Sequence, residues 1–263
     1  MFAKRLRRKT RLAAVGVLTS VCALPALAAG TDFVPFTATR VQEFQDNTGN
    51  HLVYVASVAF RSDGSWVEWR RRVNRKPVDL RAVVDVQAGK RTVIDGKTKS
   101  ITTYELSERQ VKGMLESRRR GCDKPLRGTV IEPWHKVAEK ISGFEVEKAV
   151  VEAKLPPGLG IGEKNRIEIW RAPALGCAEL RVITSTIGLE GKVVMRTRRE
   201  LTAITPGEPA WSFFEIPADY TERSPGEVFA EGAHLRGTGC RGCSVSGSLL
   251  DEVYRGSRKR QEE

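Results

Sequence analysis

The sequence has 263 residues, 44 of them basic and 32 acidic, and a formal net charge of +12 at pH 7. This length suffices for one large β domain or two small ones around a sizeable core. It contains no zinc-protease motif, nucleophile elbow or P-loop, so we expect no enzyme. It has no recognition helix or aromatic basic platform that would indicate nucleic-acid binding.

The first 28 residues have the layout of a signal peptide. Six basic side chains lie within residues 4–11, an apolar run covers 12–24, and Ala26-Leu27-Ala28 has the small-x-small pattern that precedes cleavage. We therefore predict cleavage after Ala28 and a periplasmic protein. Secretion beyond the periplasm, and anchoring in the membrane through an uncleaved signal, are the alternatives.

Removal of this segment halves the positive charge. Its six basic residues, subtracted from +12, leave +6 on residues 29–263. Such a surplus is typical of a solvated surface, and it also suits anionic phospholipid headgroups at a membrane surface or another anionic envelope component. We expect no nucleic-acid partner, and the charge says nothing of the oligomeric state.

Short strand-like runs begin at residue 36. They are rich in β-branched and aromatic residues, and turn signals such as Asp63-Gly64 and Asp95-Gly96 separate them. The runs cover residues 36–45, 52–61, 66–73, 78–86, 91–94 and 100–104. This pattern predicts an antiparallel meander.

The period of the apolar residues then changes from two to about 3.6. Ser107 and Gln110 form a capping-box pattern, and the following helix is expected to end at Gly121. Arg118-Arg119-Arg120 at its end suits the negative end of the helix dipole, with anion binding as the alternative. A second short helix is predicted over residues 134–141.

Strand-like runs resume after Gly143 and cover residues 145–153, 166–171, 180–187 and 193–201. The proline- and glycine-rich stretch at 156–162 is interpreted as a loop. From about Glu222 the composition shifts to glycine, serine and charged residues. We therefore divide the chain into a signal peptide (1–28), a β domain (29–222) and a tail (223–263).

Four cysteines follow the predicted signal: Cys122, Cys177, Cys240 and Cys243. An even number in an exported chain favours disulfides, and three pairings are open. We prefer Cys122 with Cys177 and Cys240 with Cys243. The first bond would close a long loop and contribute roughly 3 to 4 kcal/mol.

The tail cysteines form a CxxC motif in which Arg241 is a basic neighbour that could lower a thiol pKa. No helix-like run follows, unlike in oxidoreductases, so a small local disulfide is the better interpretation. His234, Cys240 and Cys243 are suitable zinc ligands but lack a fourth. We predict no catalytic residue, no bound metal and no cofactor.

Three motifs carry a resemblance to a known family: ISGFE at 141–145, IWRAPALGC at 169–177 and FEIPADY at 214–220. Together they resemble a group of uncharacterised exported bacterial proteins similar in layout to the outer-membrane lipoprotein carrier superfamily. The resemblance implies a curved antiparallel half-barrel with helices covering its concave side. In the carriers an apolar cavity holds acyl chains, but none of the residues that line it can be assigned here.

We therefore expect a mainly β (α+β) fold, a curved antiparallel sheet with one or two helices packed on its concave face. The expected function is a non-enzymatic envelope carrier for a lipid or other apolar ligand. One alternative is a structural or interaction protein with a self-filled core, and another is a redox or metal module using Cys240 and Cys243. The tryptophans are interpreted as core or rim residues, with a ligand-lining role as the alternative: Trp66, Trp69, Trp134, Trp170 and Trp211.

Overall fold

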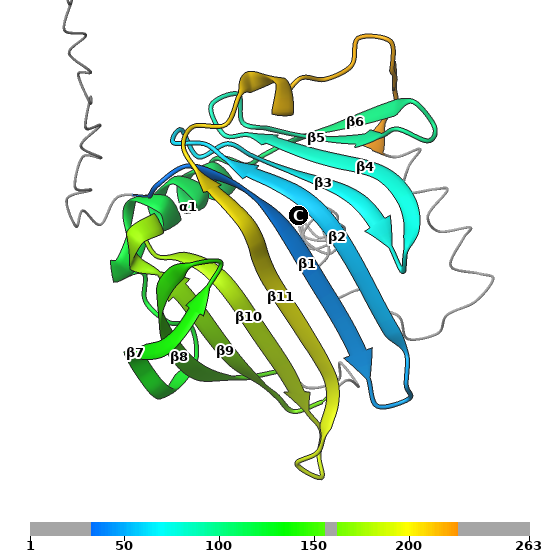
Figure 1. Ribbon diagram of the computed structural model, residues 1–263. Coiled ribbons are helices and arrows are strands. Elements are labelled where there is room, and N and C mark those ends of the chain that lie inside the picture. The colour runs from blue at the N-terminus through cyan, green and yellow to red at the C-terminus, as the bar shows by residue number, and fades with distance from the viewer. Residues whose placement is uncertain (1–32, 156–161, 226–263) are drawn as a thin grey trace, which may run out of the picture.

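The computed structural model describes residues 33–155 and 162–225 and shows one open, curved sheet of twelve strands (Figure 1). In chain order these are β1 (Phe36–Asp46), β2 (His51–Phe60), β3 (Trp66–Val73), β4 (Lys76–Asp85), β5 (Lys90–Asp95), β6 (Ser100–Glu105), β7 (Thr129–Ile141), β8 (Phe144–Lys154), β9 (Lys164–Ala172), β10 (Ala178–Ile187), β11 (Val193–Pro206) and β12 (Thr221–Glu222). The predicted half-barrel class is confirmed. Three predicted features lie outside the described residues: the signal peptide, most of the 156–162 loop, and the tail segment that carries His234, Cys240 and Cys243.

The strand order across the sheet is β12-β6-β5-β4-β3-β2-β1-β11-β10-β9-β8-β7. Neighbouring strands are antiparallel, except that β12 runs parallel to β6. β1 lies at the centre, because it pairs with β2 on one side and with the late strand β11 on the other. We call the face that carries Phe36, Arg40 and Gln42 the inner face.

Two apolar clusters form the core. The larger lies on β1, β2 and β7 to β11, and includes Phe36, Leu180 and Leu201. The smaller lies on β2 to β5, where Phe214 packs against residues such as Val67 and Val83. Phe214 follows the 3-10 helix η3 (Trp211–Phe213), so the segment after β11 returns to cover the first half of the sheet.

One α-helix, α1 (Glu108–Arg119), is present in the described part of the chain. The predicted capping box is confirmed, since Ser107 and Gln110 bond each other's backbone. The helix lies behind β1 and β11 (Figure 1), and none of its side chains is fully buried. No helix within residues 33–155 and 162–225 has the length and apolar character of a membrane span.

The predicted second helix over 134–141 is wrong, because these residues belong to β7. The pairing of β7 with β8 shifts register three times between Val130 and Lys140. Such bulges break the period of two, so Trp134, Val137 and Ile141 acquire a helix-like spacing within an irregular strand.

A disulfide joins Cys122, in the 3-10 helix η1 (Gly121–Asp123), to Cys177, with Cα atoms 5.0 Å apart. This is the pair that the sequence analysis preferred. Cys177 follows the 3-10 helix η2 (Pro173–Leu175) at the corner between β9 and β10. The bond therefore ties the end of α1 to the second half of the sheet.

Removal of this disulfide should destabilise the fold strongly. With a sequence separation of 55 residues, the unfolded chain gains entropy worth about 4 kcal/mol when the bond is absent. We expect Cys122→Ala/Cys177→Ala to lower the free energy of unfolding in urea by that amount. The matched control Cys240→Ser/Cys243→Ser should change it little, and equal losses in the two variants would contradict the assignment.

The turn between β1 and β2 is organised by Asp46. Its carboxylate accepts hydrogen bonds from the backbone N–H groups of Thr48 and Asn50, both at 2.9 Å, and from both side chains, at 2.7 and 2.8 Å. The Asn50 side chain, followed by that of Thr48, lowers the pKa of Asp46 to about 2. The ionised form is the one that holds the turn.

This shift predicts a loss of stability in acid. Because the folded pKa is about 2 and the unfolded value about 3.9, the contribution of Asp46 is present above pH 4 and disappears as the pH falls towards 2. The midpoint of thermal unfolding of Asp46→Asn should lie below that of the wild type at pH 6, and the gap should close at pH 2. A constant gap across this range would refute the prediction.

Candidate functional site

A cavity of about 270 Å³ lies between the inner face and the C-terminal part of α1. Its lining combines aromatic and aliphatic side chains with four cations and a single carboxylate. The charged members are Arg40, Arg118, Lys124, Arg199 and Glu179. We call it the inner pocket.

The apolar wall of the inner pocket comes from the start of β1 and the end of β2. Phe36 stacks on Phe60 with ring centroids 4.9 Å apart, and Phe33 lies 5.9 Å from Phe36. Leu201 of β11 completes this wall. Phe36 and Leu201 also belong to the larger core cluster, so this wall is continuous with the core.

Arg118 reaches into this pocket from the last turn of α1. Its guanidinium lies 4.0 Å from the ring centroid of Phe33 and 5.5 Å from that of Phe60. Nη1 donates a 3.0 Å hydrogen bond to the Arg61 carbonyl oxygen. No carboxylate in the described part of the chain forms an ion pair with Arg118. Burial lowers its pKa to about 10, while the nearby carboxylates of Asp63 and Glu208 oppose this shift.

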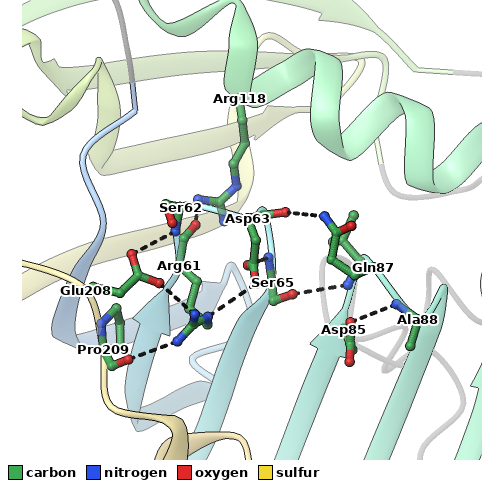
Figure 2. A network of polar contacts seen from close by, with 11 residues as sticks. Arg61, Ser62, Asp63, Ser65, Asp85, Gln87, Ala88, Arg118, Glu208 and Pro209 are labelled. Atoms are coloured by element: carbon green, nitrogen blue, oxygen red, sulfur yellow. Dashed lines mark hydrogen bonds and ion pairs between the residues drawn. The ribbon is translucent and has the colours of Figure 1, made fainter.

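The acceptor for Arg118 is held by the polar network in Figure 2. The Arg61 side chain bonds Glu208 at 3.1 Å and the Pro209 carbonyl at 3.1 Å, and its guanidinium lies 4.1 Å from the Trp211 ring. Asp63 accepts from Ser65 N–H at 2.8 Å and caps the turn between β2 and β3. The network holds the turn between β2 and β3 against the segment after β11. It therefore fixes the position of the Arg61 carbonyl oxygen to which Arg118 donates.

Arg40 approaches the pocket from β1. Nη1 pairs with Glu68 of β3, which is 2% exposed and also accepts a 2.9 Å bond from Arg70. The Nε atom of Arg40 is buried and has no hydrogen-bond partner in the structure. Burial lowers the pKa of Arg40, while Glu68 opposes this shift. A buried donor without an acceptor is costly, so Arg40 is held at an energetic cost beside the pocket.

The far end of the pocket is anchored by the disulfide. The Glu179 carboxylate forms ion pairs with Arg199 at 2.9 Å and with Lys124 at 3.4 Å, so these two cations share one carboxylate. Arg171 donates a 2.7 Å bond to the carbonyl of Cys122 and pairs with Glu147 at 2.8 Å. Cys177 and Gly121 line this end of the pocket, and the disulfide holds it in place.

A second cavity, of about 470 Å³, lies on another side of α1, next to the turn between β4 and β5. Its charged lining residues are two acids and two bases: Glu108, Lys112, Glu116 and Arg119. Three of them are exposed. Because this cavity has balanced charges and no buried polar group without a partner, the inner pocket is the stronger candidate site.

The structure separates the arginines that the sequence grouped together. Arg118 lines the inner pocket, whereas Arg119 and Arg120 are exposed, so only the first fits the anion-binding alternative. None of the tryptophans lines either cavity. Residues 33–155 and 162–225 hold no cluster of His, Cys, Asp and Glu suited to a metal ion.

The sequence analysis did not identify Arg40 and Glu68 as site residues. The sequence signal that could have identified them is the position of each residue in a strand whose side chains alternate between two faces. Arg40 occupies the same face of β1 as Phe36 and Ala38, and Glu68 occupies a position of β3 that pairs with Val58. A charged residue in register with buried apolar neighbours indicates a buried ion pair or a ligand contact.

Comparisons with known proteins give similarities among solved structures alone, since no protein-family model and no curated protein matches the sequence. An uncharacterized conserved protein from Thermus thermophilus has 10% identity and a TM-score of 0.45, and the match covers 74% of this chain and 92% of that one. A LolA superfamily protein from Nitrosomonas europaea has 8% identity and a TM-score of 0.33, with coverage of 72% and 94%. The lipoprotein LppX from Mycobacterium tuberculosis has 14% identity and a TM-score of 0.36, with coverage of 66% and 87%.

The layout expected from the sequence is present in the structure. The open, curved sheet of twelve strands has the half-barrel form that the resemblance implied.

Removal of one partner from the buried ion cluster should be costly. Glu68→Gln leaves Arg40 and Arg70 without their shared carboxylate, so we expect the free energy of unfolding to fall by about 3 to 5 kcal/mol. Arg40→Met/Glu68→Met removes the main pair together and should recover much of that loss. Chemical unfolding measures both, and a double variant as unstable as Glu68→Gln would contradict this account.

Proposed function

We propose that this protein is an exported, non-enzymatic carrier of the cell envelope that binds an acidic amphiphile, such as a fatty acid or the acyl chain of an anionic lipid. The observation that carries the proposal is the pairing of two cations with an aromatic wall in the inner pocket. Arg118 forms no ion pair in the described part of the chain, although Asp63 and Glu208 are near enough to raise its pKa, and the buried Nε atom of Arg40 has no acceptor among the described residues.

The cationic side of the pocket suits a carboxylate or a phosphate. Guanidinium groups form short, charge-assisted hydrogen bonds with such oxygens, and these bonds strengthen when water is excluded. A bound anion would also favour the charged form of Arg118, whose pKa burial has lowered to about 10. The protein retains a cation where its burial is unfavourable, which is typical of a functional site.

The apolar side suits a hydrocarbon chain. Phe33, Phe36, Phe60 and Leu201 form one continuous wall. The volume of about 270 Å³ lies slightly below the roughly 300 to 1,000 Å³ of typical small-molecule sites. The pocket therefore fits a short chain, or one end of a longer ligand.

The proposal is tested by titration calorimetry with two probes of equal chain length, octanoate and 1-octanol. Octanoate should bind the wild type more tightly than octanol. Arg118→Met keeps the bulk of the side chain and removes its charge, so octanoate binding should weaken about ten- to hundredfold. Octanol binding should stay within about twofold of the wild type.

The matched control is Arg196→Met, which removes an exposed arginine of β11 outside the pocket. It should leave both affinities unchanged. Equal weakening by the two arginine variants, or octanol binding as tight as octanoate binding, would refute the acidic-amphiphile proposal. Native mass spectrometry of the protein purified from envelope fractions should also show a lipid-sized mass that leaves on denaturation.

A further inference from the structure

The hairpin formed by β3 and β4 has an unusually basic tip. Four side chains around its turn are exposed: Arg71, Arg72, Arg75 and Lys76. The only carboxylate between Trp66 and Lys76 is Glu68, which Arg40 and Arg70 already engage. We call these four residues the basic tip.

The four charges of the basic tip are not neutralised within the described part of the chain. None of them forms an ion pair there, although basic residues elsewhere on the sheet do so repeatedly. Examples are Lys148 with Glu168 at 2.8 Å and Arg199 with Glu179 at 2.9 Å. The basic tip therefore carries a local excess of positive charge that forms no ion pair within the described part of the chain.

The turn itself adopts a conformation that its residues do not favour. Val73 pairs with Lys76, which leaves a two-residue loop with φ of 48° at Asn74 and 68° at Arg75. Such a loop favours Asn-Gly, because glycine adopts positive φ without a steric cost and arginine does not. Asn74 is further held by its backbone N–H to the Val53 carbonyl, at 2.7 Å, and by its Oδ1 accepting from Val53 N–H, at 2.8 Å. The strained position thus carries an exposed cation where glycine would fit better.

A bulge directs another cation outward. Arg70 pairs with Ala56 and Arg72 with Val55, so Arg71 is the extra residue in β3. Its guanidinium lies 3.2 Å from the ring centroid of Trp69. An arginine stacked on a tryptophan at a protruding edge is a combination that suits the boundary between lipid headgroups and water.

From these observations we infer that the basic tip docks the protein onto the surface of a bilayer that contains anionic phospholipids. Several exposed, unneutralised cations at one turn match a plane of phosphate groups, and none of them lines either of the two cavities described above. The inference does not rest on the proposed carrier function. Arg72 of the basic tip pairs with Val55 in the middle of β2, whereas the inner pocket contacts Phe60 at its end, about 17 Å further along the strand.

Cosedimentation with vesicles tests the inference, using the protein isolated from the envelope of expressing cells. The vesicles contain phosphatidylcholine alone, or phosphatidylcholine with 30% phosphatidylglycerol. The wild type should bind the anionic vesicles and not the neutral ones. Binding should weaken as salt rises from about 0.01 to 0.15 M, because the Debye length falls from about 30 to 8 Å.

Arg75→Gly is the informative single variant. It removes one charge, so binding to anionic vesicles should weaken about fivefold. It also relieves the positive φ, so the midpoint of thermal unfolding should stay equal or rise. Arg72→Gln/Arg75→Gly should weaken binding about 25-fold. Weaker binding together with unimpaired folding separates the docking role from a structural one.

The matched control is Arg109→Gln/Lys112→Gln, which removes two exposed cations of α1, away from the basic tip. It should retain vesicle binding within about twofold of the wild type. A loss equal to that of Arg72→Gln/Arg75→Gly would mean that overall charge alone drives binding, and would overturn the inference. Binding of the wild type to polyglutamate but not to anionic vesicles would also overturn it, and would assign the basic tip to an acidic protein partner.

Discussion

The fold depends on the hydrogen bonding of one strand to two others that are distant in sequence. β1 pairs along its whole length with β2, which follows it directly, and with β11, whose residues lie about 160 positions later. Until that second pairing forms, the chain is a meander of six strands on one side and a set of five on the other. The larger apolar cluster spans both sides, so its burial and the pairing of β1 with β11 stabilise each other.

The inner pocket is a consequence of this junction. Its lining comes from β1, β2 and β11 and from α1, which the disulfide ties to the other half of the sheet. Arg40 and Arg118 reach the same space from elements that are far apart in sequence. They lie beside aromatic rings because those rings belong to, or pack against, the larger core cluster. The combination of charge and hydrocarbon therefore arises from topology and not from a local motif.

This explains how much could be predicted from the sequence. The strands over 66–73 and 193–201, the capping box at Ser107 and the half-barrel class follow from local periodicity and turn chemistry, and these predictions were correct. The inner pocket could not be found in this way, because no local pattern states that β1 pairs with β11. The predicted helix at 134–141 failed for a related reason, since bulges set by the partner strand changed the period of β7.

An open sheet has two outer strands, and each presents unpaired backbone groups to which another chain could bond. On one side β12 pairs with β6 and shields part of it. On the other, β7 carries Pro133, several charged side chains and three breaks in register, so it offers no long, flat template. The irregularity of β7 that misled the helix prediction thus protects the half-barrel from polymerising edge to edge. An open, curved sheet can therefore persist without presenting two long, regular edge strands for pairing.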